Sequence, residues 1–123
     1  MSVEKTLIQL LLPEGLLDYF EVTRVSQINS EVWIYLEEQN VIPKEYEQDK
    51  LISKGFLPET CIQDFPLRGK KVFLYVKRRR WLNTQTNTVV TRDWKIAEQG
   101  TRFTPEFAFF FEELFRYHTS KLK

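Results

Sequence analysis

The residues with the clearest capacity for chemistry lie between Pro66 and Trp81. This stretch holds seven of the 18 basic residues of the chain and no acidic residue, and aromatic side chains are interleaved with the bases. Lysine and arginine neutralise phosphates and release counterions, and aromatic rings beside them stack on bases or sugars. This combination favours a nucleic acid as the partner.

The two-residue period of a β-strand divides this stretch into two faces. Val72, Leu74 and Val76 share one face, which we expect to pack against the core. The other face is predicted to carry Lys71, Phe73, Tyr75, Lys77, Arg79 and Trp81. Arg78 and Arg80 fall on the apolar face near its exposed end, where we expect them to satisfy an acid across the hairpin or to extend the positive patch.

We expect DNA contacts from this basic strand and from three bases that follow it. The predicted DNA-binding residues are Arg68, Lys70, Lys71, Lys77, Arg78, Arg79, Arg80, Trp81, Arg92, Lys95 and Arg102. Two other interpretations stay open: a strand whose charges keep a sheet edge soluble, and a surface for an acidic protein partner. The four consecutive bases at 77–80 exceed what a soluble edge requires, which favours the nucleic acid.

The residue types needed for catalysis are scarce. Cys61 is the only cysteine and His118 the only histidine, so four zinc ligands of these types are lacking. Cys61 is flanked by Thr60 and Ile62 in a strand-like run and is expected to be an inert, buried thiol. The four glycines are isolated, which excludes a glycine-rich phosphate loop. We therefore expect no enzymatic activity, no metal and no cofactor.

Charge is distributed unevenly along the chain, although the net charge is only +1. Residues 1–50 contain ten acids and four bases, a net −6, whereas the remainder contains 14 bases and seven acids, a net +7. An anion-binding surface is therefore expected in the C-terminal part. The 123 residues fit one domain spanning residues 1–123, and no apolar run is long enough to cross a membrane, so we expect a cytoplasmic protein without membrane contact.

The elements that position the basic strand can be predicted from periodicity and turn signals. Two short helices separated by Pro13-Glu14-Gly15 precede a hairpin with strands at 19–25 and 31–37. Residues 39–58 are predicted to be an irregular, exposed connector. A second β-unit follows, with strands at 60–65, 70–81 and 89–96.

A final helix is predicted to begin near Thr104-Pro105-Glu106. Its apolar face, at spacings of three and four residues, comprises Phe107, Phe110, Phe111, Leu114 and Phe115. Phe109 falls off this stripe and is expected to be exposed or to lie at an interface. The predicted fold class is α+β: a small antiparallel sheet built from β-hairpins, with a short N-terminal helical segment and one amphipathic C-terminal helix.

Several motifs together resemble a known family across residues 12–118. They are Leu12-Pro13-Glu14-Gly15, Leu17-Asp18-Tyr19-Phe20, Ile34-Tyr35-Leu36-Glu37-Glu38, Ile52-Ser53-Lys54-Gly55-Phe56, Asp64-Phe65-Pro66-Leu67-Arg68-Gly69-Lys70-Lys71-Val72, Arg78-Arg79-Arg80-Trp81, Arg92-Asp93-Trp94 and Gly100-Thr101-Arg102. The pattern resembles the N-region protein of bacterial insertion-sequence transposases of the ISAon type. It is also distantly similar to the zinc-finger N-terminal segments of a broader transposase group, but Cys61 stands alone where those segments carry two Cys-x-x-Cys pairs. The resemblance therefore implies a metal-free finger, held by the packing of residues such as Trp81, Val89 and Trp94.

The resemblance implies a non-catalytic DNA-binding module of a split transposase. Such a module recognises transposon-end DNA, while a separately encoded catalytic transposase subunit cleaves and joins the strands. The rival hypothesis is an assembly factor that binds this catalytic subunit without touching DNA, and a degenerate remnant without function is a third. The sequence leaves a homodimer open.

Overall fold

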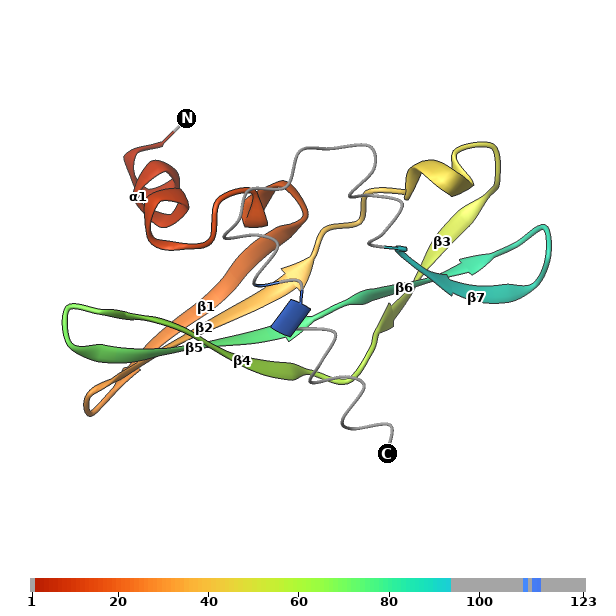
Figure 1. The fold of residues 1–123 in the computed structure, drawn as a ribbon. Helices are drawn as coiled ribbons and strands as arrows, with labels where there is room; N and C mark the ends of the chain where they lie inside the picture. Colours follow the sequence, from red (N-terminus) through yellow and green to blue (C-terminus); the bar gives the residue numbers. More distant parts are fainter. Residues whose placement is uncertain (1, 94–109, 111, 114–123) are drawn as a thin grey trace.

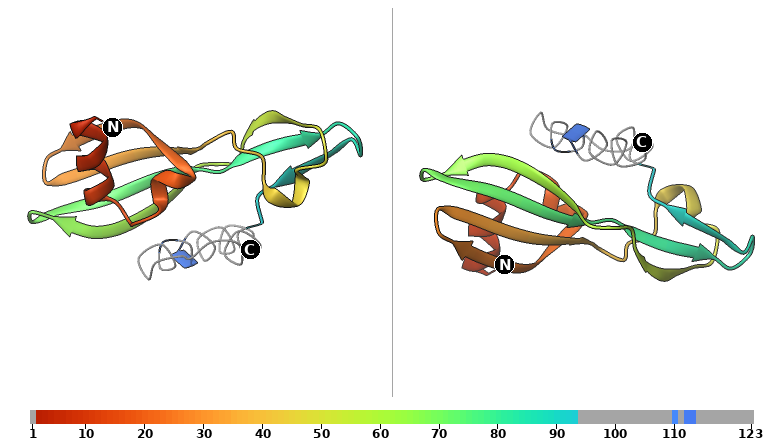
Figure 2. Two further views of the ribbon diagram at one scale, coloured as in Figure 1. Left: turned by 90° about the horizontal axis from the view of Figure 1, so that it is seen from above. Right: turned by 90° about the horizontal axis from the view of Figure 1, so that it is seen from below.

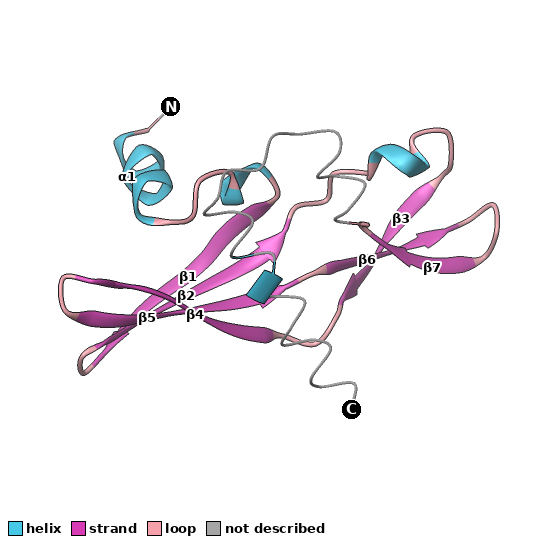
Figure 3. Cartoon of the chain, viewed as in Figure 1, coloured by secondary structure: helices cyan, strands magenta, loops and turns pink. Residues whose placement is uncertain are grey.

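The computed structural model describes residues 2–93, 110, 112 and 113, and strands dominate them (Figure 1, Figure 3). The elements in chain order are α1 (Val3–Leu11), η1 (Leu16–Asp18), β1 (Phe20–Ile28), β2 (Glu31–Glu38), η2 (Lys44–Tyr46), β3 (Leu51–Phe56), β4 (Thr60–Leu67), β5 (Lys70–Lys77), β6 (Arg79–Asn83) and β7 (Thr88–Thr91). Ser2 caps α1, because its Oγ accepts a hydrogen bond of 3.0 Å from the backbone N–H of Lys5. Gly15, with φ of 90°, allows the turn into η1, so the N-terminal helical segment is confirmed, with a single 3-10 turn in the place of the second predicted helix.

Four strands form the larger sheet, in the order β1-β2-β5-β4. Both predicted hairpins are present, because β1 pairs antiparallel with β2 and β4 pairs antiparallel with β5. The central pair, β2 and β5, is parallel, and Glu31 lies beside Lys71 at one end of it. The prediction of a wholly antiparallel sheet is therefore wrong at this pair. Turn signals specify each hairpin, but they do not specify how two hairpins align when both bury an apolar face.

A second sheet is formed by β3, β6 and β7, which pair antiparallel in that order. The long strand predicted from Lys70 to Trp81 belongs to both sheets, since its regular pairing stops at Arg78 and resumes in β6 (Figure 1). The strand β3 lies within the predicted connector, so the irregular assignment of residues 39–58 is wrong there. Its polar side chains and Gly55 give no alternating pattern, and β3 is specified instead by its pairing with β6.

Helix α1 lies over one face of the four-stranded sheet, and no described element covers the opposite face (Figure 2). The covered face carries the core, in which Leu36, Leu74 and Val76 are at most 1 % exposed. The other core residues are Leu12, Leu16, Phe20, Ile34, Ile62, Val72 and Phe110. Val72, Leu74 and Val76 thus face the core as predicted.

The predicted C-terminal helix lies outside the described residues except for Phe110, Glu112 and Glu113. Phe110 is buried, and its ring meets that of Phe20 edge-on at a centroid distance of 6.1 Å. Phe109, predicted to be exposed or at an interface, lies outside the described residues, as does Trp94. No helix among the described residues is long and apolar enough to span a membrane.

Candidate nucleic-acid interface

The carboxylate of Glu38 accepts hydrogen bonds from an arginine of the basic strand and from an arginine that directly follows β7. Arg92 Nε donates to Glu38 Oε2 over 2.8 Å, and the backbone N–H of Arg79 donates to Glu38 Oε1 over 3.0 Å. Burial raises the pKa of Glu38, while these two donors act in the opposite direction by stabilising the charged form. Burial also shifts the pKa of Arg78, in this case downward, whereas the negative charge of Glu38 acts to raise it. This cluster sits where β5 passes into β6, and it joins the two sheets.

The remaining guanidinium contacts of these arginines are also internal. Arg79 Nε donates to the carbonyl of Glu38 over 3.0 Å, and its guanidinium lies 4.7 Å from the ring centroid of Phe56. Arg92 donates to the carbonyl of Val41 over 2.6 Å. Arg80 donates to the carbonyl of Lys54 over 3.2 Å. Most of the arginine-rich run at 77–80 therefore holds β6 against its neighbours.

Trp81, predicted to share a face with Lys71 and Lys77, is fully buried. Its Nε1 donates to Asn40 Oδ1 over 2.8 Å. The alternation of buried and exposed side chains shifts by one residue where β5 passes into β6. Val76 and Arg78 are buried up to this point, and Trp81 and Asn83 are buried beyond it. The predicted orientation of Trp81 is therefore wrong, because a strict two-residue period does not survive a break in the ladder. A buried indole has no free face for stacking on a base.

The exposed bases of the predicted set gather at the turn between β4 and β5. Arg68 and Lys71 are exposed and Lys70 is half-buried. Arg68 and Gly69 have φ of 54° and 80°, which is the geometry of a tight two-residue hairpin turn. The backbone N–H of Lys71 donates to the carbonyl of Ser30 over 3.1 Å, which fastens this turn to the neighbouring β1–β2 turn. The bases therefore stand on a fixed tip and not on a loose loop.

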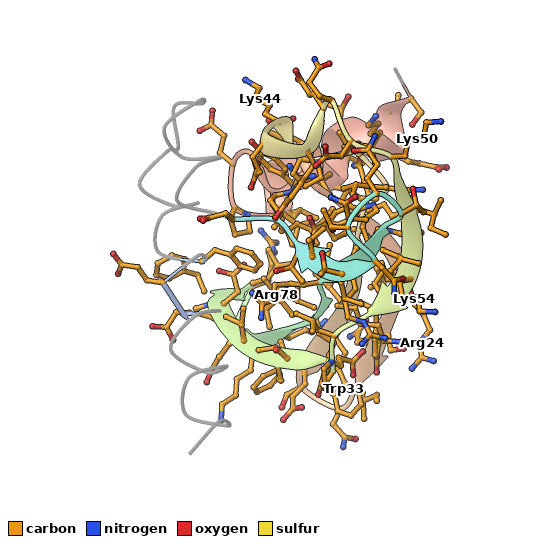
Figure 4. All side chains as sticks on the ribbon, turned by 90° about the vertical axis from the view of Figure 1, so that its right-hand side faces the viewer. Arg24, Trp33, Lys44, Lys50, Lys54 and Arg78 are labelled. Carbon is orange, nitrogen blue, oxygen red and sulfur yellow. The ribbon has the colours of Figure 1, made fainter. Side chains whose placement is uncertain are left out.

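No described residue forms a side-chain hydrogen bond or ion pair with these three bases. We define the basic tip as Arg68, Lys70 and Lys71. Figure 1 shows that this turn ends the four-stranded sheet on the side away from the second sheet. Figure 4 shows a contrasting position for Arg78, which lies toward the interior, whereas Lys44, Lys50, Lys54 and Arg24 project from the margin. Lys95 and Arg102 lie outside the described residues.

The uncovered face of the four-stranded sheet carries an aromatic row that the sequence did not reveal. Tyr35 and Tyr75 stack at a centroid distance of 4.9 Å with 15° between their planes. Arg24 covers Tyr35 at 4.3 Å from the ring centroid and donates to its hydroxyl over 3.1 Å. Trp33 lies tilted against Tyr75 at 5.5 Å. Tyr35 and Tyr75 each cover one face of the other, and the β2–β5 pairing, which no local signal specifies, brings these rings together.

Lys71, Phe73, Tyr75 and Lys77 do share this uncovered face, as the strand period predicted. Cys61, on β4 opposite Tyr75 of β5, is half-buried, and burial raises the pKa of its thiol. Among the described residues, no group of three or more His, Cys, Asp or Glu side chains lies close enough to hold a metal ion.

Comparisons of the chain with protein-family models, with curated proteins and with solved structures find no match. The resemblance to insertion-sequence proteins stays a prediction from sequence motifs.

Proposed function

We propose that this chain is a non-catalytic module that binds duplex DNA through the basic tip of the β4–β5 hairpin. The observation that carries the proposal is the gathering of three bases, Arg68, Lys70 and Lys71, on one tight turn at the end of the sheet, where no described residue forms a side-chain hydrogen bond or ion pair with them. Lysine and arginine side chains on such a turn neutralise phosphates along a duplex and fix the orientation of the protein on it. Lys77, half-buried on the uncovered face of the same strand, extends the positive charge away from the tip.

Duplex DNA is favoured over a single strand because three rings near the basic strand, Tyr35, Tyr75 and Trp81, are covered by neighbouring side chains or buried. Sequence-tolerant binding of single strands relies on free rings against which successive bases stack. Tyr35 and Tyr75 face each other, Arg24 covers Tyr35, and Trp81 is buried. The cations that remain accessible suit phosphate contacts, which are common to any duplex.

The resemblance to the ISAon-type proteins suggests transposon-end DNA as the target and a separately encoded catalytic transposase subunit as a partner. This part of the proposal rests on motifs such as Asp64-Phe65-Pro66-Leu67-Arg68-Gly69-Lys70, which include the whole turn. Sequence preference would then come from whichever basic side chain of the tip reaches the edge of a nucleotide base in the groove.

Fluorescence anisotropy with labelled DNA tests the proposal. The probes are a duplex of the terminal sequence of the element, a scrambled duplex, and one strand of each. In the tip variant Arg68→Asn, Lys70→Gln and Lys71→Gln are combined, because asparagine tolerates the positive φ at position 68. The matched control combines Lys44→Gln, Lys50→Gln and Lys54→Gln, three exposed bases of η2 and the second sheet (Figure 4).

We expect the tip variant to lose about tenfold or more in duplex affinity, because three phosphate-neutralising charges are removed, and the control to lose much less. Circular dichroism should show both variants folded, since no described residue forms a side-chain hydrogen bond or ion pair with the tip bases. Equal losses in the two variants would mean that binding follows total charge and not the tip. If no duplex binds the wild-type chain, the assembly-factor hypothesis becomes the better one.

A further inference from the structure

Helix α1 turns the centre of its apolar face toward solvent. Leu7 is 54 % exposed, Leu10 76 % and Leu11 53 %, and no residue of α1 is buried. Only the flank of the helix reaches the core, where Ile8 is half-buried. A nine-residue helix has little stability of its own, so a face of this kind indicates a surface that is covered in the assembled protein.

The apolar surface continues from the helix onto the sheet. A cavity of about 360 Å³ opens between α1 and the sheet, and Leu10, Leu11, Val25 and Phe65 all line it. Val25 is 57 % and Phe65 66 % exposed. We define the α1 surface as Val3, Leu7, Leu10, Leu11, Val25 and Phe65. It lies on the covered side of the sheet and shares no residue with the basic tip.

The size of the α1 surface fits a protein interface. Its six side chains are each more than half exposed, so together they offer apolar area on the order of several hundred Å² per copy, approaching the ~800 Å² that each partner contributes to a standard interface. Isolated apolar side chains on a surface are ordinary, whereas a connected patch of this extent marks an interaction site.

The pattern on α1 is self-complementary. Leu7 is the middle residue of Val3–Leu11, and Val3 and Leu11 lie equally far from it on the same face. If two copies of the helix cross antiparallel at Leu7, Val3 of each copy meets Leu11 of the other. Such a contact is isologous and closes as a dimer.

The charges of α1 favour the antiparallel arrangement. Glu4 and Lys5 are the only charged residues of the helix, and both lie in its first turn. A parallel pair would place Glu4 beside Glu4 and align the two helix dipoles, whereas an antiparallel pair separates these like charges by the length of the helix.

We infer that the α1 surface is the interface of a two-fold symmetric dimer of this chain, in which two α1 helices pack antiparallel with Leu7 against Leu7. The dimer covers the leucines of both helices and closes the open side of both cavities. It presents two basic tips, but it forms independently of DNA.

Sedimentation velocity across a range of protein concentrations tests for the dimer. Leu7→Glu places a charge at the centre of the interface, and Gln9→Glu places the same charge on the exposed opposite side of the same helix. We expect Leu7→Glu to weaken dimerisation by about tenfold or more and Gln9→Glu to leave it unchanged, because only the first buries an unpaired charge. A wild-type chain that stays monomeric, or equal behaviour of the two variants, overturns the proposal.

Cysteine cross-linking tests the symmetry. In a Cys61→Ser background, Leu7→Cys should form a disulfide-linked dimer on mild oxidation, because a residue on the two-fold axis faces its own copy. Gln9→Cys should not do so. Mixing a Val3→Cys chain with a differently tagged Leu11→Cys chain should give the mixed dimer. Cross-linking of Gln9→Cys as fast as Leu7→Cys, or Val3→Cys pairing with itself in preference to Leu11→Cys, overturns the antiparallel arrangement.

Discussion

Arg92 and Glu38, 54 residues apart in the chain, form an ion pair in which Arg92 Nε lies 2.8 Å from Glu38 Oε2. Both side chains are almost completely buried, at 6 % and 1 % exposure. Glu38 ends β2 in the larger sheet, and Arg92 directly follows β7 in the smaller one. The pair therefore fastens the two sheets together at the point where β5 passes into β6.

Removing one member of this pair should be strongly destabilising. We expect Arg92→Ala to lower the free energy of unfolding by about 3–5 kcal/mol, because it leaves the buried Glu38 carboxylate without its charged partner. The double variant Arg92→Leu with Glu38→Leu should recover part of the loss. Denaturant melts followed by circular dichroism measure both. A loss within about 0.5 kcal/mol, as is typical of an exposed site, would contradict a buried pair.

Glu38 should also make stability depend on pH. Burial raises its pKa in the folded state, so the folded protein binds this proton more tightly than the unfolded chain does. The Glu38 contribution to stability is therefore fully present below the unfolded pKa and is lost as the pH rises through the folded pKa. Compared with Glu38→Gln, which does not titrate, the wild type should gain stability as the pH falls from neutrality toward 4.5, the ordinary value for a glutamate. The opposite trend in paired melts would mean that Arg92 and Arg79 outweigh burial.

Cys61 should react slowly with thiol reagents in the folded protein. Burial raises its pKa, so little thiolate is present near neutral pH, and the thiolate is the reactive form. A chromogenic disulfide reagent should modify Cys61 markedly faster in denaturant than in buffer. Tyr75→Phe, which removes the hydroxyl beside the thiol, provides the comparison, and equal rates for folded and unfolded chain would contradict the assignment.

Phe110 is predicted to be a core residue whose loss leaves a cavity. Phe110→Ala should lower the free energy of unfolding by about 3–5 kcal/mol, the usual cost of emptying a buried aromatic site. The ring is 2 % exposed and packs edge-on against Phe20. Glu112→Ala, two residues away and exposed, is the matched control and should change stability by less than about 0.5 kcal/mol. A larger loss of stability for Glu112→Ala than for Phe110→Ala would mean that a different side of this segment faces the sheet.

Local patterns in the sequence predicted the hairpins and the core face of β5. The apolar alternation of Val72, Leu74 and Val76 and the turn at Arg68-Gly69 act over a few residues, so they can be interpreted without a tertiary structure. The parallel pairing of β2 with β5 and the strand β3 could not be predicted in this way, because both depend on partners far along the chain.

The predicted DNA-binding residues fall into an exposed group and an internally bonded group, and only the first follows from local sequence. Arg68, Lys70 and Lys71 lie in a turn, where exposure follows from local geometry. The fate of Arg79 and Arg92 depends on Glu38, a residue more than forty positions from either in the sequence. A run of consecutive arginines looks the same in sequence whether it binds phosphate or a buried carboxylate, and only the position of the carboxylate distinguishes the two.

The salt dependence of DNA binding separates these two groups of bases. The logarithm of the binding constant falls with the logarithm of salt concentration at about 0.9 per neutralised phosphate on duplex DNA. With the basic tip, Lys77 and one further contact engaged, we expect a wild-type slope of roughly −4 to −5. Neutralising Arg68, Lys70 and Lys71 should flatten this slope by about 2 to 3, because each removed phosphate contact takes away close to one unit.

Arg79→Ala combined with Arg80→Ala should act differently, since both guanidinium groups donate to protein oxygens. We expect this pair to change the slope by less than about one unit and to lower stability instead, because a buried carbonyl loses its donor. Titrations from about 50 to 200 mM salt, on chains shown to be folded at each salt concentration, measure both quantities. A slope that Arg79→Ala and Arg80→Ala flatten by about 2, with the tip substitutions leaving it unchanged, would move the DNA-binding surface from the hairpin tip to the β5–β6 junction.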